Sequence, residues 1–249
     1  MICYPNVKIN LGLHVLRRRP DGFHDLETLF VPYPEISDCL EVIPADDYSR
    51  TLALLKERYG TLTQAISPDG KLMITIARKE GVDWDPLKDL TAKAYALLAA
   101  DFDLPPMKLF LEKRSPVGAG LGGGSADAAF ALRAMAQLAG LDLPDATLAA
   151  YAARLGSDCA FFVYNRPMFG SGRGEVLEPF AIDLSQYRLE VVVPEGIAVS
   201  TAEAYRGITP RIPEKPCGKC YGRISSRGRQ TLGTTLKRRY SPFILPWRR

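Results

Sequence analysis

The 249-residue sequence has no apolar run long enough to cross a bilayer, so we expect no membrane span and no membrane partner. The first residues, Met1 to Pro5, lack a basic stretch followed by an apolar core, which argues against a secretory signal. Only five cysteines occur, and their irregular spacing is not that of a disulfide framework. We therefore expect a cytoplasmic protein with reduced thiols.

Charge is divided unevenly along the chain. Lys and Arg number 32 and Asp and Glu 28, yet residues 211–249 hold eleven of the basic residues and one acidic residue, Glu214. The rest of the chain is therefore net acidic. The basic tail lacks amphipathic periodicity, and its composition is that of a disordered segment. The basic balance of the whole chain is thus no argument for a nucleic-acid partner, and we expect none.

The most informative segment is Pro116-Val-Gly-Ala-Gly-Leu-Gly-Gly-Gly-Ser-Ala-Asp-Ala-Ala129, with five glycines between Gly118 and Gly124. A strand pattern precedes it and an alanine-rich helix pattern follows. Glycines let the backbone approach an anion, and the first N–H groups of a helix point at it. The segment predicts a phosphate-binding loop.

Two other interpretations of this loop are open. It formally matches the dinucleotide fingerprint at Gly118, Gly120 and Gly123, but no strand with a closing acidic residue follows the helix. It lacks the Gly-Lys-Ser/Thr ending of a P-loop. A glycine-rich turn without any ligand is the other alternative, although the entropy cost of so many glycines needs a reason.

Hydrophobic periodicity predicts an α+β fold, with several strands followed by helices rather than a regular alternation. The expected strands are 7–16, 26–33, 39–43, 72–77, 107–113 and 187–193. The expected helices are 87–100, 125–138, 145–155 and 201–206. Residues 44–70 give no clear pattern.

Three segments together resemble the GHMP small-molecule kinases. The first is the glycine loop itself; the others are Pro5-Asn-Val-Lys-Ile-Asn-Leu-Gly-Leu13 with Arg18-Arg-Pro-Asp-Gly-Phe-His-Asp-Leu26, and Leu155-Gly-Ser-Asp-Cys-Ala-Phe-Phe162. The resemblance runs from about Val7 to Pro210. It narrows to those members that phosphorylate a hydroxyl of a cytidine diphosphate-linked polyol in isoprenoid precursor synthesis.

The resemblance implies a two-lobed fold. Residues 1–155 would form an N-terminal lobe like domain 2 of ribosomal protein S5, carrying the ATP-binding loop. Residues 156–210 would begin an incomplete ferredoxin-like C-terminal lobe, followed by the tail 211–249. It also implies ATP and Mg²⁺ as cofactors, no metal site made of protein side chains, and a monomer or weak homodimer.

Lys8 and Asp158 are the catalytic residues that the resemblance implies. By themselves, Lys8 would be a solvated charge on a strand, and Asp158 a cap or turn after a helix-stopping glycine. In the family, the carboxylate would accept the proton of the attacking hydroxyl. The lysine, close to it in space, would keep it ionised.

The nucleotide site implied by the resemblance is the glycine loop and its helix. Its expected residues are Pro116, Gly118, Gly120, Leu121, Gly122, Gly123, Gly124, Ser125 and Asp127. Asp127 has two interpretations: compensation of the helix dipole, or a contact on the Mg²⁺ or nucleotide side. Asp89 departs from the Asn that the family commonly has in its adenine-side helix.

Four residues are expected on the substrate side. His24 would ordinarily be a surface turn residue, but the resemblance places it against cytosine, with Phe23 and Tyr205 as aromatics that stack on the base. Asn10 faces away from Val7 and Ile9 and is expected near Lys8.

The tail departs from the family, and we hypothesise a shifted reading frame after about residue 211. Codons exist for Gly233 to Arg248 that, read from the third base, encode Asn-Asp-Phe-Glu, a segment expected of the family here. Such a chain would be an inactive, truncated form. Coding DNA whose codons cannot encode that run would end the hypothesis.

Two further functions compete with the favoured one. The chain could be another GHMP kinase, acting on mevalonate, homoserine or a sugar. It could instead bind nucleic acid through the tail, whose basic residues are interleaved with Tyr221, Tyr240, Phe243 and Trp247.

Overall fold

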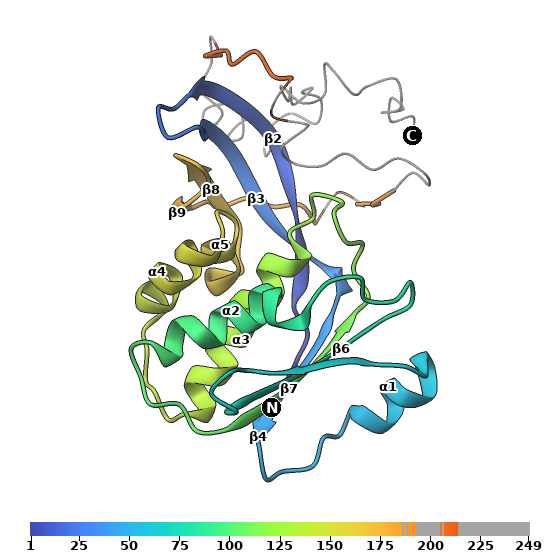
Figure 1. Cartoon of the computed structure of the whole chain (residues 1–249). Helices are drawn as coiled ribbons and strands as arrows, with labels where there is room; N and C mark the ends of the chain where they lie inside the picture. The colour runs from blue at the N-terminus through green and yellow to red at the C-terminus, as the bar shows by residue number, and fades with distance from the viewer. Residues whose placement is uncertain (186, 188, 193–204, 206, 214–249) are drawn as a thin grey trace. The chain divides into compact units, whose positions relative to one another are not determined.

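The structure is a computed structural model that describes residues 1–185, 187, 189–192, 205 and 207–213. Its α+β chain divides into two compact units (Figure 1), which we describe each by itself. The first comprises Met1–Lys8, Pro32–Val117 and Leu121–Asn165, and the second Ile9–Val31, Gly118–Gly120 and the described part of 166–249. Both units are therefore assembled from segments far apart in the sequence.

The first unit holds a five-stranded sheet in the order β1-β4-β7-β6-β5. These strands are β1 (Ile2–Cys3), β4 (Cys39–Pro44), β5 (Thr63–Ile66), β6 (Leu72–Arg78) and β7 (Met107–Lys113). β7 lies centrally, antiparallel to β4 and parallel to β6, and Leu109 and Leu111 within it are fully buried. Every residue of this central strand except Lys108 is buried, including the charged Glu112 and Lys113.

The helices of the first unit are α1 (Leu52–Tyr59), α2 (Leu90–Ala99), α3 (Gly123–Leu138), α4 (Asp145–Leu155) and α5 (Cys159–Tyr164). Figure 1 shows α2 to α5 gathered beside the sheet, and α3 contacts the other three as well as β4. Its alanines permit this, because small side chains let helices approach closely. Ala126, Ala128, Ala131 and Ala134 are almost completely buried.

The second unit contains a four-stranded sheet in the order β2-β3-β8-β9. The strands are β2 (Asn6–Arg18), β3 (His24–Ser37), β8 (Met168–Ser171) and β9 (Val176–Pro179), and β2 and β3 have their ends in the first unit. Leu29 and Val31 form the core, with Phe169, Phe180 and neighbouring aliphatic side chains packed against them. The long strand β2 thus carries the first motif of the sequence.

Most predicted elements are present, with shifted ends. The helix expected from residue 87 begins at Leu90, because Asp89 caps it by accepting a hydrogen bond from the N–H of Thr91 at 2.9 Å. The helix expected from Ser125 begins two residues earlier, at Gly123. Residues 44–70, which gave no clear pattern, contain α1 and β5.

One prediction is wrong. The described residues of 187–193, Tyr187 and Leu189–Val192, form no strand. High β propensity alone did not make a strand of these described residues. Of the helix expected over 201–206 only Tyr205 is described, and the tail from residue 214 lies outside the described residues. The expected lobe boundary at 155/156 falls inside the first unit, between α4 and α5.

Candidate active site

The glycine loop joins β7 to α3, as the sequence predicts for a phosphate-binding loop. Gly118, Gly120 and Gly122 have φ of 77°, 73° and 74°, a region that side chains disfavour. Gly122 is the N-cap of α3. The next residues, Gly123, Gly124 and Ser125, begin the helix, and the first N–H groups of a helix have no partners within it. The loop therefore ends in backbone donors suited to an anion.

Glycine is also required here by close packing. A Cβ on Gly122 would lie 3.0 Å from the ring of Phe162 and 3.2 Å from Cε of Lys8. A Cβ on Gly123 would collide with Oγ of Ser115. The start of α3 is thus pressed between three side chains from other segments of the first unit. The phosphate-binding reading explains the positive φ values, and this packing explains why residues 122 and 123 in particular lack side chains.

Lys8 and Asp158 meet in the first unit although 150 positions separate them. Nζ of Lys8 lies 3.1 Å from Oδ2 of Asp158. The lysine side chain is 5% exposed and the aspartate 32%, so the carboxylate keeps access to solvent while the ammonium is enclosed. The backbone N–H of Lys8 donates to the carbonyl of Leu121 at 2.9 Å, which ties this part of β2 to the glycine loop.

Asp158 owes its position to the break between α4 and α5. Gly156 ends α4 in an extended conformation, and Asp158 precedes the first residue of α5. Its side chain makes no capping bond to α5, so the carboxylate is turned to Lys8 instead. Ser125, in the first turn of α3, forms a hydrogen bond with the thiol of Cys159, the residue that follows Asp158. The start of α5 and the start of α3 are therefore in contact beside this pair.

Asp127 does not lie where a nucleotide contact requires. Its side chain is 1% exposed and accepts a hydrogen bond from Nζ of Lys113 at 2.5 Å. Burial, only partly offset by Lys113, raises the pKa of this carboxyl well above its ordinary value. The sequence placed Asp127 in the first turn of a helix from Ser125, but α3 begins two residues earlier, so Asp127 is its fifth residue. Asp127 instead faces the interior, which argues against the direct contact with nucleotide or Mg²⁺ that we expected.

The expected substrate residues all lie in the second unit. The rings of His24 and Tyr205 are 5.3 Å apart, although 181 positions separate them, which brings together two of the predicted aromatics. Phe23 is exposed and has the guanidinium of Arg173 5.0 Å from its ring centre. Asn10 donates through Nδ2 to Oγ1 of the buried Thr28 at 2.9 Å. Arg173 is a residue that sequence reasoning missed, because no motif marks it.

Known proteins resemble this chain over most of its length. A model of the GHMP kinases N terminal domain matches residues 89–166. The 4-diphosphocytidyl-2-C-methyl-D-erythritol kinase of Parabacteroides distasonis is 42% identical over 214 residues, which cover 86% of this chain and 69% of the relative. The kinase of the same name from Bacteroides fragilis is 41% identical, with 86% and 70% covered. This chain belongs to the 4-diphosphocytidyl-2-C-methyl-D-erythritol kinase family.

Solved structures agree with this assignment to the family. The crystal structure of a 4-(cytidine 5'-diphospho)-2C-methyl-D-erythritol kinase superposes with a TM-score of 0.65 and 29% identity, covering 95% of this chain and 76% of that one. A homoserine kinase from Cytophaga hutchinsonii, 12% identical, superposes with a TM-score of 0.51 over 86% of this chain and 61% of its own, and shows the shared fold alone. The expected GHMP kinase fold is confirmed.

Asp89, where the resemblance led us to expect an asparagine, is held by local hydrogen bonds. One oxygen accepts from the N–H and hydroxyl of Thr91, and the other from the indole N–H of Trp84 at 3.1 Å. An asparagine could accept these bonds through only one oxygen. The departure from the common family residue is thus explained locally, by the cap of α2 and its bond to Trp84.

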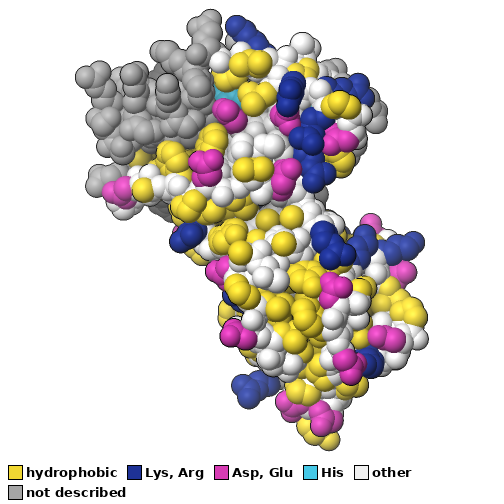
Figure 2. Space-filling view, turned by 90° about the vertical axis from the view of Figure 1, so that its left-hand side faces the viewer, with side chains coloured by type: hydrophobic (Ala, Val, Ile, Leu, Met, Phe, Trp, Pro, Cys, Tyr) yellow, Lys and Arg dark blue, Asp and Glu magenta, His cyan; other side chains and the backbone are white. Residues whose placement is uncertain are grey.

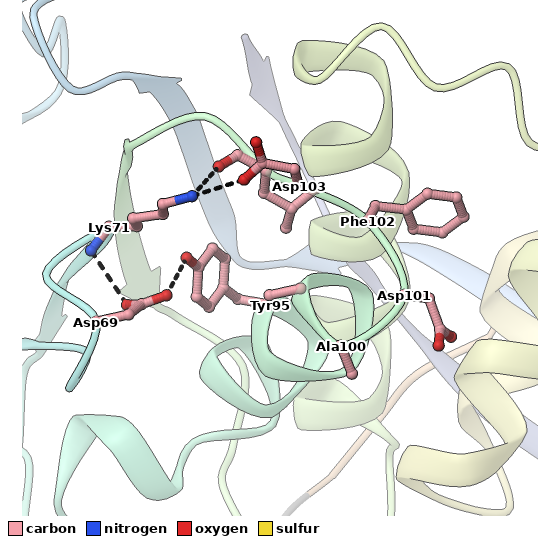
Figure 3. Close-up of a pocket in the computed structure, with 9 residues that line it drawn as sticks. Asp69, Lys71, Tyr95, Ala100, Asp101, Phe102 and Asp103 are labelled. Atoms are coloured by element: carbon pink, nitrogen blue, oxygen red, sulfur yellow. Dashed lines mark hydrogen bonds and ion pairs between the residues drawn. The ribbon is translucent and has the colours of Figure 1, made fainter.

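A separate pocket in the first unit lies at the end of α2 (Figure 3). Its volume is about 380 Å³, and Asp69, Asp101 and Asp103 are among its lining residues. Tyr95 donates to Asp69 at 2.9 Å and Lys71 to Asp103 at 2.7 Å. A phosphate group here would face three carboxylates, and none of the predicted site residues lines the pocket. We therefore place the candidate site at the glycine loop.

Neighbouring positions in the first turn of α3 provide a matched test of the packing. Gly123→Ala should destabilise the protein by about 1–3 kcal/mol, because its Cβ collides with Ser115. Gly124→Ala meets nothing closer than 3.9 Å and should be neutral or stabilising by up to about 1 kcal/mol. Urea unfolding of both variants measures the difference. Equal stabilities would contradict the close approach at Gly123.

The thiol of Cys159 reports on the burial of the start of α5. Burial raises the pKa of this thiol from 9.0 to about 11. Between these values the folded chain keeps a proton that the unfolded chain loses, so the free energy of unfolding should fall as pH rises from 9 to 11. Unfolding at pH 8 and pH 10.5 should show a smaller fall in Cys159→Ala than in the unchanged chain. Rapid alkylation of native Cys159 at pH 8 would contradict this burial.

Proposed function

We propose that the chain transfers the terminal phosphoryl group of ATP to the 2-hydroxyl of 4-diphosphocytidyl-2-C-methyl-D-erythritol, in isoprenoid precursor synthesis. The observation that carries the proposal is the Lys8–Asp158 pair beside the start of α3, in a chain of this kinase family. Phosphoryl transfer needs positioning and positive electrostatics more than covalent help from protein. A donor-rich loop next to a carboxylate–ammonium pair supplies both.

The glycine loop is the proposed cradle for the ATP phosphates. Gly118, Gly120 and Gly122 let the backbone turn its N–H groups toward an anion, and the positive end of the α3 dipole adds to the attraction. Pro116, Leu121, Gly123, Gly124 and Ser125 complete the segment that we assign to the nucleotide. We leave Asp127 out of direct contact because its side chain is buried.

Asp158 is the proposed general base. Its carboxylate is partly exposed, as a group must be that takes a proton from an incoming hydroxyl. The enclosed ammonium of Lys8, 3.1 Å away, holds the carboxylate of Asp158 in place and would also offset charge that develops on the transferred group. The partly exposed Asp158 can thus meet the substrate hydroxyl, and the enclosed Lys8 can stabilise negative charge beside it.

The aromatic residues of the second unit are the proposed cytosine contacts. His24 and Tyr205 lie 5.3 Å apart with an angle of 35° between their planes. Phe23, with Arg173 over its ring, offers a second exposed aromatic face. Asn10 is proposed as a polar contact to the substrate. Its bond to the buried Thr28 would hold it in one orientation.

Mg²⁺ is the proposed second cofactor, and its chemistry is to neutralise and bridge the phosphates. Among the residues that the structure describes, no group of three or more His, Cys, Asp or Glu side chains is placed to hold a metal ion. Mg²⁺ in kinases is bound mainly by phosphates, waters and one or two protein oxygens. The hydroxyl of Ser125 is an oxygen donor that fits this limited role.

The competing functions have less support. The named relatives favour a cytidine-containing substrate over mevalonate, homoserine or a sugar. On the face of the described residues in Figure 2, Lys and Arg side chains are interspersed with Asp and Glu, unlike the basic track of a nucleic-acid binder. The tail on which that alternative rested lies mostly outside the described residues.

No helix in the described part of the chain is long and apolar enough to span a bilayer.

Coupled ADP release from ATP and 4-diphosphocytidyl-2-C-methyl-D-erythritol tests the function. Asp158→Asn should lower kcat by roughly 10²–10⁴-fold, because the amide cannot accept the proton. Its affinity for ATP should change little, since the phosphates are held elsewhere. Asp103→Asn, an exposed carboxylate of the same unit, is the matched control and should retain full activity.

Two results would revise the proposal. Full activity of Asp158→Asn would remove this residue from the role of base. Turnover of homoserine or mevalonate, with no inhibition by CDP, would move the substrate assignment to another GHMP kinase, because only the favoured substrate carries cytidine.

A further inference from the structure

A buried charge cluster lies behind the glycine loop, and the proposed chemistry does not use it. It consists of Lys113 at the end of β7, Asp38 between β3 and β4, and Asp127 in α3. Their side chains are 4%, 0% and 1% exposed. Nζ of Lys113 forms ion pairs with both carboxylates. We call these three residues the buried triad.

The buried triad holds the chain on both sides of the glycine loop. Before the loop, Oδ1 of Asp38 accepts from the N–H groups of Arg114 and Ser115 at 2.6 and 2.7 Å, and Oδ2 accepts from the Ser115 hydroxyl at 2.8 Å. After the loop, Lys113 reaches Asp127 in α3. One ammonium thus connects the strand that enters the loop with the helix that leaves it.

The same cluster sets how far α3 approaches β7. Ser115, which Asp38 holds, leaves no room for a side chain on Gly123. Nζ of Lys113 lies only 3.5 Å from the place where that Cβ would be. The ammonium is therefore directly behind the first turn of α3, whose N–H groups we assign to phosphate. A displacement of the triad displaces those donors.

Stability alone is a poor explanation of this arrangement. Two buried carboxyl groups share one ammonium in a place closed to solvent, where charged groups are costly. Oδ1 of Asp127 is buried and lacks a hydrogen-bond partner. An apolar group of similar shape would avoid both costs. A directional tie between strand and helix is what an apolar group would not supply.

We propose that Lys113, Asp38 and Asp127 are positioning residues that fix the first turn of α3 relative to the glycine loop and thereby set the affinity for the nucleotide triphosphate. The proposal rests on the function assigned above, because it needs the nucleotide at this loop. It concerns the nucleotide and leaves binding of the polyol substrate unchanged, since the triad belongs to the first unit alone and the proposed cytosine contacts to the second.

The test is titration calorimetry of the full chain with AMP-PNP, together with thermal unfolding. Lys113→Met keeps the length of the side chain but leaves two carboxylates without their cation. We expect AMP-PNP to bind about tenfold or more weakly, as misplaced binding groups do, and unfolding to occur at lower temperature. Lys71→Met, which breaks the exposed pair with Asp103 in the same unit, is the control and should change neither.

A second pair of variants separates positioning from mere stability. Lys113→Met combined with Asp127→Asn removes one of the stranded charges, so it should unfold at a higher temperature than Lys113→Met alone. Its affinity for AMP-PNP should stay weak, because the tie to α3 is still missing. Asp127→Asn alone exchanges the ion pair with Lys113 for a weaker hydrogen bond, so it should raise the KM for ATP less than Lys113→Met does, while leaving the KM for the polyol unchanged.

The possible failures can be told apart. If the unchanged chain does not bind AMP-PNP, the proposed function fails and this proposal fails with it. Suppose instead that the unchanged chain binds AMP-PNP, and that Lys113→Met and Asp127→Asn, below their unfolding temperatures, bind it with the same affinity as the unchanged chain. Only the positioning role is then overturned. Recovery of affinity together with stability in the double variant would likewise reduce the triad to a structural role.

Discussion

Close packing at the start of α3 is the constraint on which the proposed site depends. Lys8 and Phe162 close on Gly122, and Ser115 closes on Gly123, so that no side chain fits at either residue. Because the helix begins there, the same packing fixes the direction of its first N–H groups. The Lys8–Asp158 pair is held beside it through the backbone bond from Lys8 to Leu121. In our proposal, anion binding and proton transfer therefore depend on one crowded contact among β2, the end of the glycine loop and α5.

The charged groups around this contact differ in their exposure to solvent. Asp158 remains partly exposed, where it can meet an incoming hydroxyl, and Lys8 is enclosed beside it. Farther inside, Lys113 is surrounded by Asp38 and Asp127, and these groups are closed to solvent. Two lysines of the same unit thus have different surroundings. One is next to the reacting groups in our proposal, and the other supports the backbone that binds the phosphates.

The sequence correctly predicted the local backbone structure of the candidate site. The glycine spacing indicated a loop with left-handed residues followed by a helix, and Gly118, Gly120 and Gly122 have such conformations. The strand pattern around Lys8 was also correct. Asp127 was placed in the first turn of a helix expected from Ser125, but α3 begins at Gly123, so Asp127 lies one turn in and is buried. The described residues of 187–193 form no strand, because β propensity alone does not determine one.

The sequence by itself determined the α+β character, the glycine loop followed by a helix and, through three motifs, the kinase family. These depend on residue types at short spacings, where backbone conformation and helix geometry are decided locally. Only the tertiary structure decided that Lys8 touches Asp158, that His24 touches Tyr205, and that Lys113 joins Asp38 to Asp127. Such contacts arise when strands and helices far apart in the chain bury their apolar faces together, and no local spacing encodes which polar side chains then meet.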